Sequence, residues 1–138
     1  MEFFHKNLVA NSVVIKPIKS YSDIRGVIAT VIDTPAEGVL FITSKAGTKR
    51  ANHYHKTSGH YCVLTKGKMK YYERACGVQD KPKVMELGVG EVFWTGPMVE
   101  HLMVFTEDSE FWCFSTGCRN QENYEDDLVR LEYQLDEL

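Results

Sequence analysis

The sequence lacks any long apolar run, any surplus of positive charge and any cysteine pattern typical of a metal finger. No stretch approaches the roughly 18 apolar residues that a membrane-spanning helix needs, and the N-terminus does not have the basic-then-apolar order of a signal peptide. With 16 Lys and Arg against 19 Asp and Glu, the formal charge of −3 provides no positive field for nucleic acid phosphates. We therefore expect a cytoplasmic protein whose partners are neither membranes nor nucleic acids.

Cysteine is also scarce, with four residues in a chain of 138. These cysteines form no CxxC pair, and a chain of this length does not need disulfides to fold, so we expect free thiols. The remaining composition, 43% hydrophobic and 25% charged, is that of one globular domain. The composition predicts a single domain over residues 1–138.

The chain does contain a series of short β-branched and aromatic runs with glycines between them. The runs with the length and composition of strands are 27–32, 38–43, 60–65, 68–73, 83–87, 91–95 and 111–115. Such spacing is typical of a meander or barrel and not of alternating strands and helices. The pattern predicts an all-β fold with a barrel over about 12–117.

The end of the chain has a different period. Apolar or aromatic side chains recur at spacings of four, three and four, at Tyr124, Leu128, Leu131 and Leu135. This spacing predicts one amphipathic α-helix over about 121–136, docked on the flank of the barrel with an acidic face in solvent.

Four of the five histidines fall into two clusters, one at residues 53–60 and one at His101. His53 and His55 alternate, so in a strand both imidazoles project from the same face. A short loop follows, and a hairpin would bring His60 back beside them. An isolated HxH is more often a packed or surface pair than a functional site, so its surroundings decide its meaning.

The spacing around these histidines resembles the cupin superfamily. Its first motif, G-x5-HxH-x4-E-x6-G, is matched at Gly47, His53, His55 and Gly67. His60 stands at the glutamate position, and the second motif, G-x5-PxG-x2-H-x3-N, is matched at Gly90 and His101. The resemblance implies a single-domain cupin, a double-stranded β-helix or jelly-roll barrel followed here by the C-terminal α-helix. It also implies that both motifs line a cavity at one end of the barrel.

In metal-dependent cupins, these motif positions hold a divalent ion. By this resemblance the metal ligands would be His53, His55, His60 and His101, an all-imidazole set suited to Zn, Fe, Ni or Cu. One hypothesis is therefore a metal-dependent cupin that acts as an oxygenase or small-sugar isomerase. The other is that the histidines act as acid and base groups without an essential metal.

Three segments resemble the sugar-nucleotide 3,4-ketoisomerase, or WxcM-like, branch of the cupins. They are 23–26 (DIRG), 50–56 (RANHYHK) and 124–130 (YEDDLVR). The resemblance implies an isomerase that converts a dTDP-4-keto-6-deoxyhexose into its 3-keto isomer, in cell-surface polysaccharide biosynthesis. It also implies that no cofactor is required and that the protein is a homodimer.

Moving a carbonyl between adjacent carbons needs a base for the proton next to the ketone and acids at the oxygens. Imidazoles titrate near pH 7 and can do both. On this resemblance we expect His55 to be the main base and His53 or Tyr54 to relay protons at oxygen. His101 or His60 would polarise the keto group.

Arginine is the natural partner for a diphosphate, because its guanidinium binds phosphate oxygens bidentately. The resemblance therefore points to Arg25 and Arg50 for substrate binding, and we add Lys56 and Tyr61. A third hypothesis stays open beside the two enzymes: a non-catalytic cupin that binds a sugar, because one fold hosts many functions.

Overall fold

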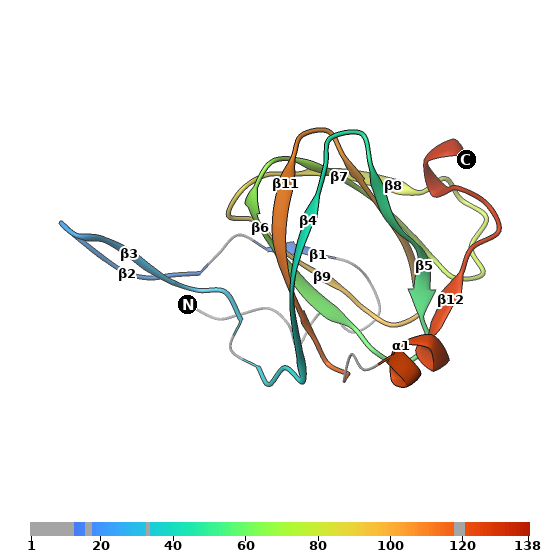
Figure 1. Cartoon of the computed structure of the whole chain (residues 1–138), viewed down its shortest axis with the longest axis horizontal. Helices are drawn as coiled ribbons and strands as arrows, with labels where there is room; N and C mark the ends of the chain where they lie inside the picture. The colour runs from blue at the N-terminus through green and yellow to red at the C-terminus, as the bar shows by residue number, and fades with distance from the viewer. Residues whose placement is uncertain (1–12, 16–17, 33, 118–120) are drawn as a thin grey trace.

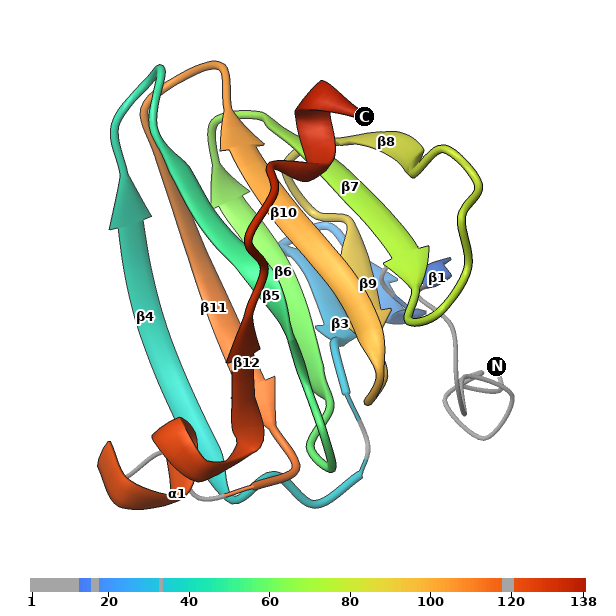
Figure 2. The same cartoon turned by 90° about the vertical axis from the view of Figure 1, so that its right-hand side faces the viewer.

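The computed structural model describes residues 13–15, 18–32, 34–117 and 121–138, and its main feature is a pair of five-stranded antiparallel sheets facing each other (Figures 1 and 2). The first sheet consists, in spatial order, of β1 (Val13–Ile15), β9 (Val92–Thr95), β6 (His60–Lys66), β11 (Ser109–Ser115) and β4 (Gly38–Ser44). The second consists of β12 (Leu128–Arg130), β5 (Lys49–His55), β10 (Val99–Phe105), β7 (Met69–Ala75) and β8 (Lys83–Leu87).

A two-stranded arm, one α-helix and one 3-10 turn complete the described chain. Strands β2 (Ile18–Asp23) and β3 (Gly26–Thr30) pair into a two-stranded arm that extends away from the barrel (Figure 1). Helix α1 (Gln121–Asp127) lies at one end of the barrel, and a 3-10 turn, η2 (Leu135–Glu137), packs against β7 and β10. Among the described residues, no helix is long and apolar enough to cross a membrane.

The expected all-β jelly-roll barrel is confirmed. Each of the seven predicted strands is present, with ends that differ by no more than two residues from the predicted ones. Strand β4 shows why the pattern is readable: its burial alternates residue by residue, with Leu40 and Ile42 turned to the core and Val39 and Phe41 to solvent.

The apolar core fills one end of the space between the sheets. It consists of Cys62, Leu64, Phe93, Phe111 and Cys113 from the first sheet and Met69, Tyr71, Leu87, Met103 and Phe105 from the second. The register places Phe105 opposite Met69, and Phe111 opposite Leu64. The histidines occupy the other ends of β5, β6 and β10, so the core closes one end of the barrel and leaves polar side chains at the other.

The predicted C-terminal helix over about 121–136 is too long. Helix α1 ends at Asp127, and residues 128–130 continue as β12, which pairs with β5 so that Leu128 lies opposite His55 and Arg130 opposite His53. The edge of β5 offers backbone donors and acceptors that a strand satisfies and a helix does not. The periodic apolar residues therefore belong to three different elements, α1, β12 and η2. The last of them, Leu135, is a buried residue of η2.

The β5–β6 hairpin is also wrong. The two strands belong to opposite sheets: β5 pairs with β10 and β12, whereas β6 pairs with β9 and β11. His60 nevertheless comes close to the other histidines, because the loop after β5 crosses from one sheet to the other and β6 faces β5 across the barrel. The reason for the proximity is sandwich packing and not strand pairing.

Candidate active site

A cavity of ≈ 280 Å³ lies between the two sheets at the polar end of the barrel. Its walls are Leu40, Ile42, Arg50, Ala51, His53, His55, His60, His101, Met103, Phe111, Cys113 and Tyr124. The aliphatic and aromatic members come mostly from the first sheet and the histidines mostly from the second. A few convergent polar groups in a largely apolar hollow are typical of a small-molecule site.

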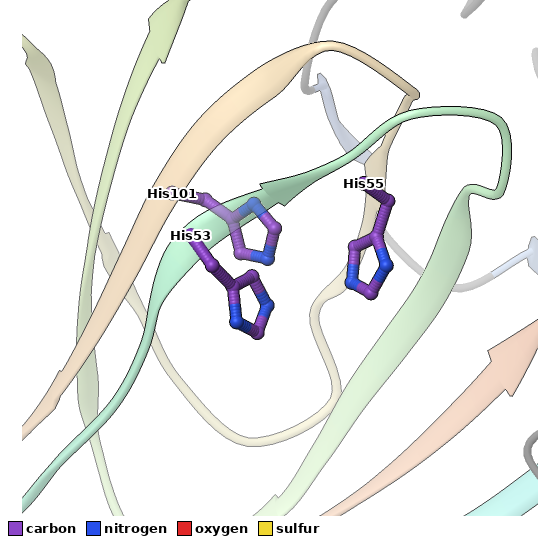
Figure 3. A group of neighbouring side chains, drawn as sticks. All are labelled: His53, His55 and His101. Atoms are coloured by element: carbon purple, nitrogen blue, oxygen red, sulfur yellow. The ribbon is translucent and has the colours of Figure 1, made fainter. Parts of the chain in front are cut away.

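Three histidines form the centre of the polar wall (Figure 3). His53 and His55 project from alternate positions of β5, and His101 lies directly opposite His53 on β10. One ring nitrogen of each lies within 4.8 Å of one ring nitrogen of the others. The ring centroid of His53 is 4.7 Å from that of His101 and 4.9 Å from that of His55.

His60 faces this group from the opposite sheet. Its ring centroid lies 5.6 Å from that of His55 and 5.3 Å from that of His101, and its side chain is buried. His60 is not one of the three histidines whose nitrogens meet within 4.8 Å. All four predicted histidines thus line one cavity, three as a cluster and the fourth beside it.

Hydrogen bonds set the tautomers of two of these rings. His55 Nδ1 lies 3.0 Å from Asp127 Oδ2, and His101 Nδ1 lies 2.9 Å from the carbonyl oxygen of Val99. A carbonyl or a carboxylate accepts, so Nδ1 is the donor in each ring and, when the ring is neutral, Nε2 carries the lone pair. Each ring therefore has the tautomer needed for a base, or for a metal ligand, at Nε2.

Asp127 is the most strongly bound carboxylate near the cavity. Its Oδ2 accepts from Ser58 Oγ as well as from His55, and its Oδ1 accepts from the Thr57 backbone N–H at 2.7 Å and from Thr57 Oγ1 at 2.8 Å. Burial alone would raise the pKa of this carboxyl. The hydrogen bonds from Ser58 and Thr57, together with the charge of His55, outweigh burial and hold the pKa well below its usual range. Asp127 is therefore a permanent anion behind His55, where it orients the ring and stabilises its protonated form.

Tyr124 and Arg50 complete the polar lining. The Tyr124 ring reaches the cavity from α1, with its centroid 6.0 Å from that of His55. Arg50 reaches it from β5, and its guanidinium donates to Ser44 Oγ and to the carbonyl oxygen of Thr43 at 2.8 Å. The cavity thus presents a phenol near His55 and a guanidinium held by two hydrogen-bond partners at its wall.

The other expected site residues do not line this cavity. Tyr54 alternates away from His53 and His55 on β5, and Lys56 is exposed in the loop that follows. Tyr61 packs against Trp94 in a second apolar cluster, on the face of β6 opposite to His60. Arg25 lies at the tip of the β2–β3 arm, where it pairs with Asp23.

The sequence analysis does not predict two residues of this site, Tyr124 and Asp127. Both belong to the C-terminal segment 124–130 that resembles the ketoisomerase motif. They lie three positions apart on α1, so both side chains are on one face of this short helix, next to His55. A helix predicted over 121–136 on the barrel flank gives no reason to place them at the cavity.

Comparison with known proteins supports the fold. No protein-family model and no curated protein sequence matches the chain. Among solved structures, the 3,4-ketoisomerase QdtA from Thermoanaerobacterium thermosaccharolyticum in complex with TDP superposes with a TM-score of 0.71 at 23% identity, covering 92% of this chain and 93% of that one. The TDP-quinovose 3,4-ketoisomerase WlaRB from Campylobacter jejuni gives a TM-score of 0.74 at 12% identity, over 89% and 95% of the two chains.

A sugar-nucleotide epimerase has the same architecture as these ketoisomerases. The dTDP-4-dehydrorhamnose 3,5-epimerase from Sulfolobus tokodaii gives a TM-score of 0.69 at 18% identity, covering 88% of this chain and 77% of that one. At these identities the likeness establishes the fold: the chain has the jelly-roll barrel found in these ketoisomerases and epimerases.

Proposed function

We propose that the protein is a sugar-nucleotide isomerase that converts a dTDP-4-keto-6-deoxyhexose into its 3-keto isomer by histidine acid–base catalysis. The observation that carries this proposal is the His55–Asp127 pair in a cavity that also holds Tyr124. A carboxylate behind an imidazole, with a phenol as a second proton-carrying group beside it, is the equipment that proton transfer between adjacent carbons requires.

The reaction moves protons and leaves the oxidation level of the whole molecule unchanged. Nε2 of His55 takes the proton from C3, and the electron pair forms an enediolate across C3 and C4. The proton then goes to C4 and a second proton goes to the C4 oxygen, which becomes a hydroxyl, while the C3 hydroxyl loses its proton and becomes the new ketone. Tyr124, His53 and His101 are the groups that would exchange protons with the two oxygens or polarise the ketone.

Arg50 is the cation we assign to the diphosphate. Its side chain is held by Ser44 and Thr43, so little conformational freedom is lost when it binds phosphate oxygens. The role in cell-surface polysaccharide biosynthesis belongs to the same proposal and rests on the motif resemblance, and we propose a cytoplasmic location with it.

Proton exchange tests the chemistry directly. In D2O, the wild-type protein should introduce deuterium at C3 or C4 of a dTDP-4-keto-6-deoxyhexose and produce the 3-keto isomer, both followed by NMR. His55→Ala should lower the rate by about 10²–10⁴-fold, the usual contribution of a positioned base. Asp126→Asn, on the exposed neighbour of Asp127, should leave the rate unchanged. Binding of the sugar nucleotide without exchange would identify a non-catalytic sugar-binding cupin instead.

A metal-dependent cupin is the second candidate, favoured by the three ring nitrogens that lie within 4.8 Å of one another. Tetrahedral Zn–N bonds of about 2.1 Å would need those nitrogens roughly 3.4 Å apart, so the rings of His53, His55 and His101 would have to draw together. His60 would then supply a fourth imidazole. Elemental analysis of untagged protein tests this: about one Zn, Fe, Ni or Cu per chain, lost in His60→Ala and His101→Ala alike, would favour the metal enzyme.

We further propose a homodimer assembled through the arm. The exposed apolar residues of the arm are Tyr21, Ile24, Val27 and Ile28. The outer face of the first sheet exposes a matching strip made of Val39, Phe41 and Trp112, with the Phe41 and Trp112 rings 4.9 Å apart. Contiguous exposed apolar surface of this kind is typical of an interface, and the arm of a second copy is the occupant we propose for the strip.

A further inference from the structure

Strand β5 contains a bulge that determines which of its side chains face the cavity. On β10, the register pairs His53 with His101 and Ala51 with Leu102, so Asn52 has no opposite residue. A regular strand would turn Arg50 and His53 to opposite faces, because they are three positions apart. The extra residue restores the parity, and both line the same cavity.

The backbone of the bulge adopts an uncommon conformation. Ala51 has φ 73° and Asn52 has φ 61°, two successive residues in the left-handed region. Asparagine tolerates this region better than most residues, whereas alanine has no local compensation. Something outside the strand must therefore help to keep the bulge in place.

Asn52 is bound at three points by the C-terminal segment, residues 131–135. Its backbone carbonyl accepts from the Leu131 N–H at 3.1 Å. Its side chain donates from Nδ2 to the carbonyl oxygen of Tyr133 at 2.7 Å and accepts at Oδ1 from the Leu135 N–H at 3.1 Å. One side chain thus satisfies backbone groups of two residues that lie more than eighty positions away in the sequence.

We infer that Asn52 is a positioning residue: clamped by the C-terminal segment, it holds the β5 bulge that turns Arg50 and His53 into one cavity. Asn52 is not part of the cavity wall, and it acts through the two residues that flank the bulge. The part of this inference that concerns substrate rests on the proposed function. The part that concerns the placement of His53 does not.

A double-mutant cycle measures the coupling. Affinity for dTDP is determined by titration calorimetry for the wild type, Arg50→Ala, Asn52→Ala and the double variant. Arg50→Ala should weaken binding about tenfold in the wild type and less than about threefold in the Asn52→Ala background, because Arg50 is already misplaced there. Equal losses in both backgrounds would overturn the inference.

Two further variants separate positioning from general loosening of the chain. Asp136→Asn removes the 2.6 Å ion pair between Lys49 and Asp136, the residue that follows this segment, and does not remove a partner of Asn52, so Arg50→Ala should keep its full effect there. Asn52→Gly keeps the left-handed conformation accessible and loses only the side-chain clamp. It provides a folded test, with the same direction of effect, if Asn52→Ala fails to fold.

A readout without nucleotide keeps this inference distinct from the proposed function. The ring proton and carbon signals of His53, which packs edge-on against His101, should shift in Asn52→Ala and stay in place in Asp136→Asn. If wild-type protein binds no dTDP but this shift is seen, the proposed function fails and the positioning role stands. An unmoved His53 signal in both Asn52 variants refutes the positioning role even where dTDP binds.

Discussion

At the scale of single residues, the polar end of the cavity is organised by Asp127. One carboxylate receives hydrogen bonds from His55, Thr57 and Ser58, which joins the end of β5, the following loop and the end of α1. A partly buried carboxylate with this many donors is held in its ionised form. The same contacts that fix the orientation of His55 therefore also contribute to the stability of the fold.

The pH dependence of unfolding should reveal this contribution. Because the folded-state pKa of Asp127 lies below its unfolded value, its stabilising effect is present in full above the unfolded pKa and is lost as pH falls through the folded one. We expect Asp127→Asn to lower the free energy of unfolding by about 2 kcal/mol at pH 7, the scale of hydrogen bonds to a charged group. The deficit should shrink as pH falls below about 4.

Urea denaturation of both proteins at pH 7 and pH 3.5 measures this difference, with the exposed neighbour variant Asp126→Asn as the control. A deficit of the same size at both pH values would show that the loss arises from packing and not from the charge of Asp127.

Ala51 offers a second test at this scale. Its φ of 73° is a conformation that costs an L-residue about 1–2 kcal/mol and costs glycine nothing. Replacing Ala51 by glycine would relieve this strain, but glycine loses more backbone entropy on folding, which offsets part of the gain in stability. We expect Ala51→Gly to raise the free energy of unfolding by about 0.5–1 kcal/mol in urea denaturation. A loss of stability would mean that contacts of the Ala51 methyl group outweigh the strain.

The sequence predicts the histidines of the site better than their neighbours. His53, His55, His60 and His101 all line the predicted cavity, because motif spacing is a local property. The period-two rule alone places Arg50 on the wrong face, since nothing in strand alternation announces a bulge. Tyr61 was expected to bind substrate, yet β6 is covered on both faces and its outward side chains pack in an apolar cluster.

At the scale of elements, the C-terminal segment shows where periodicity fails. A stripe at spacings of four, three and four describes a helix in isolation, but residues 128–130 form a ladder with β5 instead. The hydrogen bonds that stabilise this strand come from the edge of β5, more than seventy positions away in the sequence. A prediction from neighbouring residues cannot include them. Long-range hydrogen bonding also explains residues 131–135: their backbone groups bind Asn52 of β5 and are not part of a continued helix.

Strands β6 and β11 place two cysteines directly opposite each other. Cys62 and Cys113 are register partners with Sγ atoms 2.7 Å apart, and both are buried thiols. Opposed residues of antiparallel strands have Cα atoms about 4.5–5.5 Å apart, which is within the span of a disulfide. Because Cys113 also lines the cavity, a small oxidant can reach it.

We expect hydrogen peroxide to convert this pair into a disulfide: two thiols and one peroxide give one disulfide and two waters, and the protein loses about 2 Da. Peptide mapping under non-reducing conditions should recover Cys62 joined to Cys113. The product should form in Cys76→Ser and be absent in Cys113→Ser. Sulfinic acid on Cys113 with no cross-link would show that the strands do not bring the two sulfurs together in solution.

At the scale of the whole molecule, the arm separates one expected substrate residue from the cavity. Arg25 is at its tip, and the arm extends away from the barrel (Figure 1). Docked on a second copy, the arm would bury Ile24, Val27 and Ile28 and bring Arg25 to the partner's surface. We propose that each cavity takes Arg50 from its own chain and Arg25 from the other.

The dimer itself is tested by light scattering coupled to gel filtration. We expect twice the chain mass for the wild type and a shift towards the monomer for Val27→Glu with Ile28→Glu, because two charges would have to be buried at the interface. Val84→Glu changes an exposed apolar residue of β8, outside the arm, and should leave the mass unchanged.

Complementation between defective chains decides whether Arg25 acts across the interface. Arg25→Ala and Arg50→Ala should each lose most of the turnover as homodimers. Co-expressed, they form mixed dimers in which one cavity has both arginines, Arg50 from the first chain and Arg25 from the second, while the other cavity has neither. With random pairing, about one quarter of the wild-type activity should return. If Arg25 served the cavity of its own chain, each cavity of a mixed dimer would still lack one arginine, and co-expression would restore nothing. Dimers that form normally and show no recovery would therefore show that Arg25 does not act across the interface.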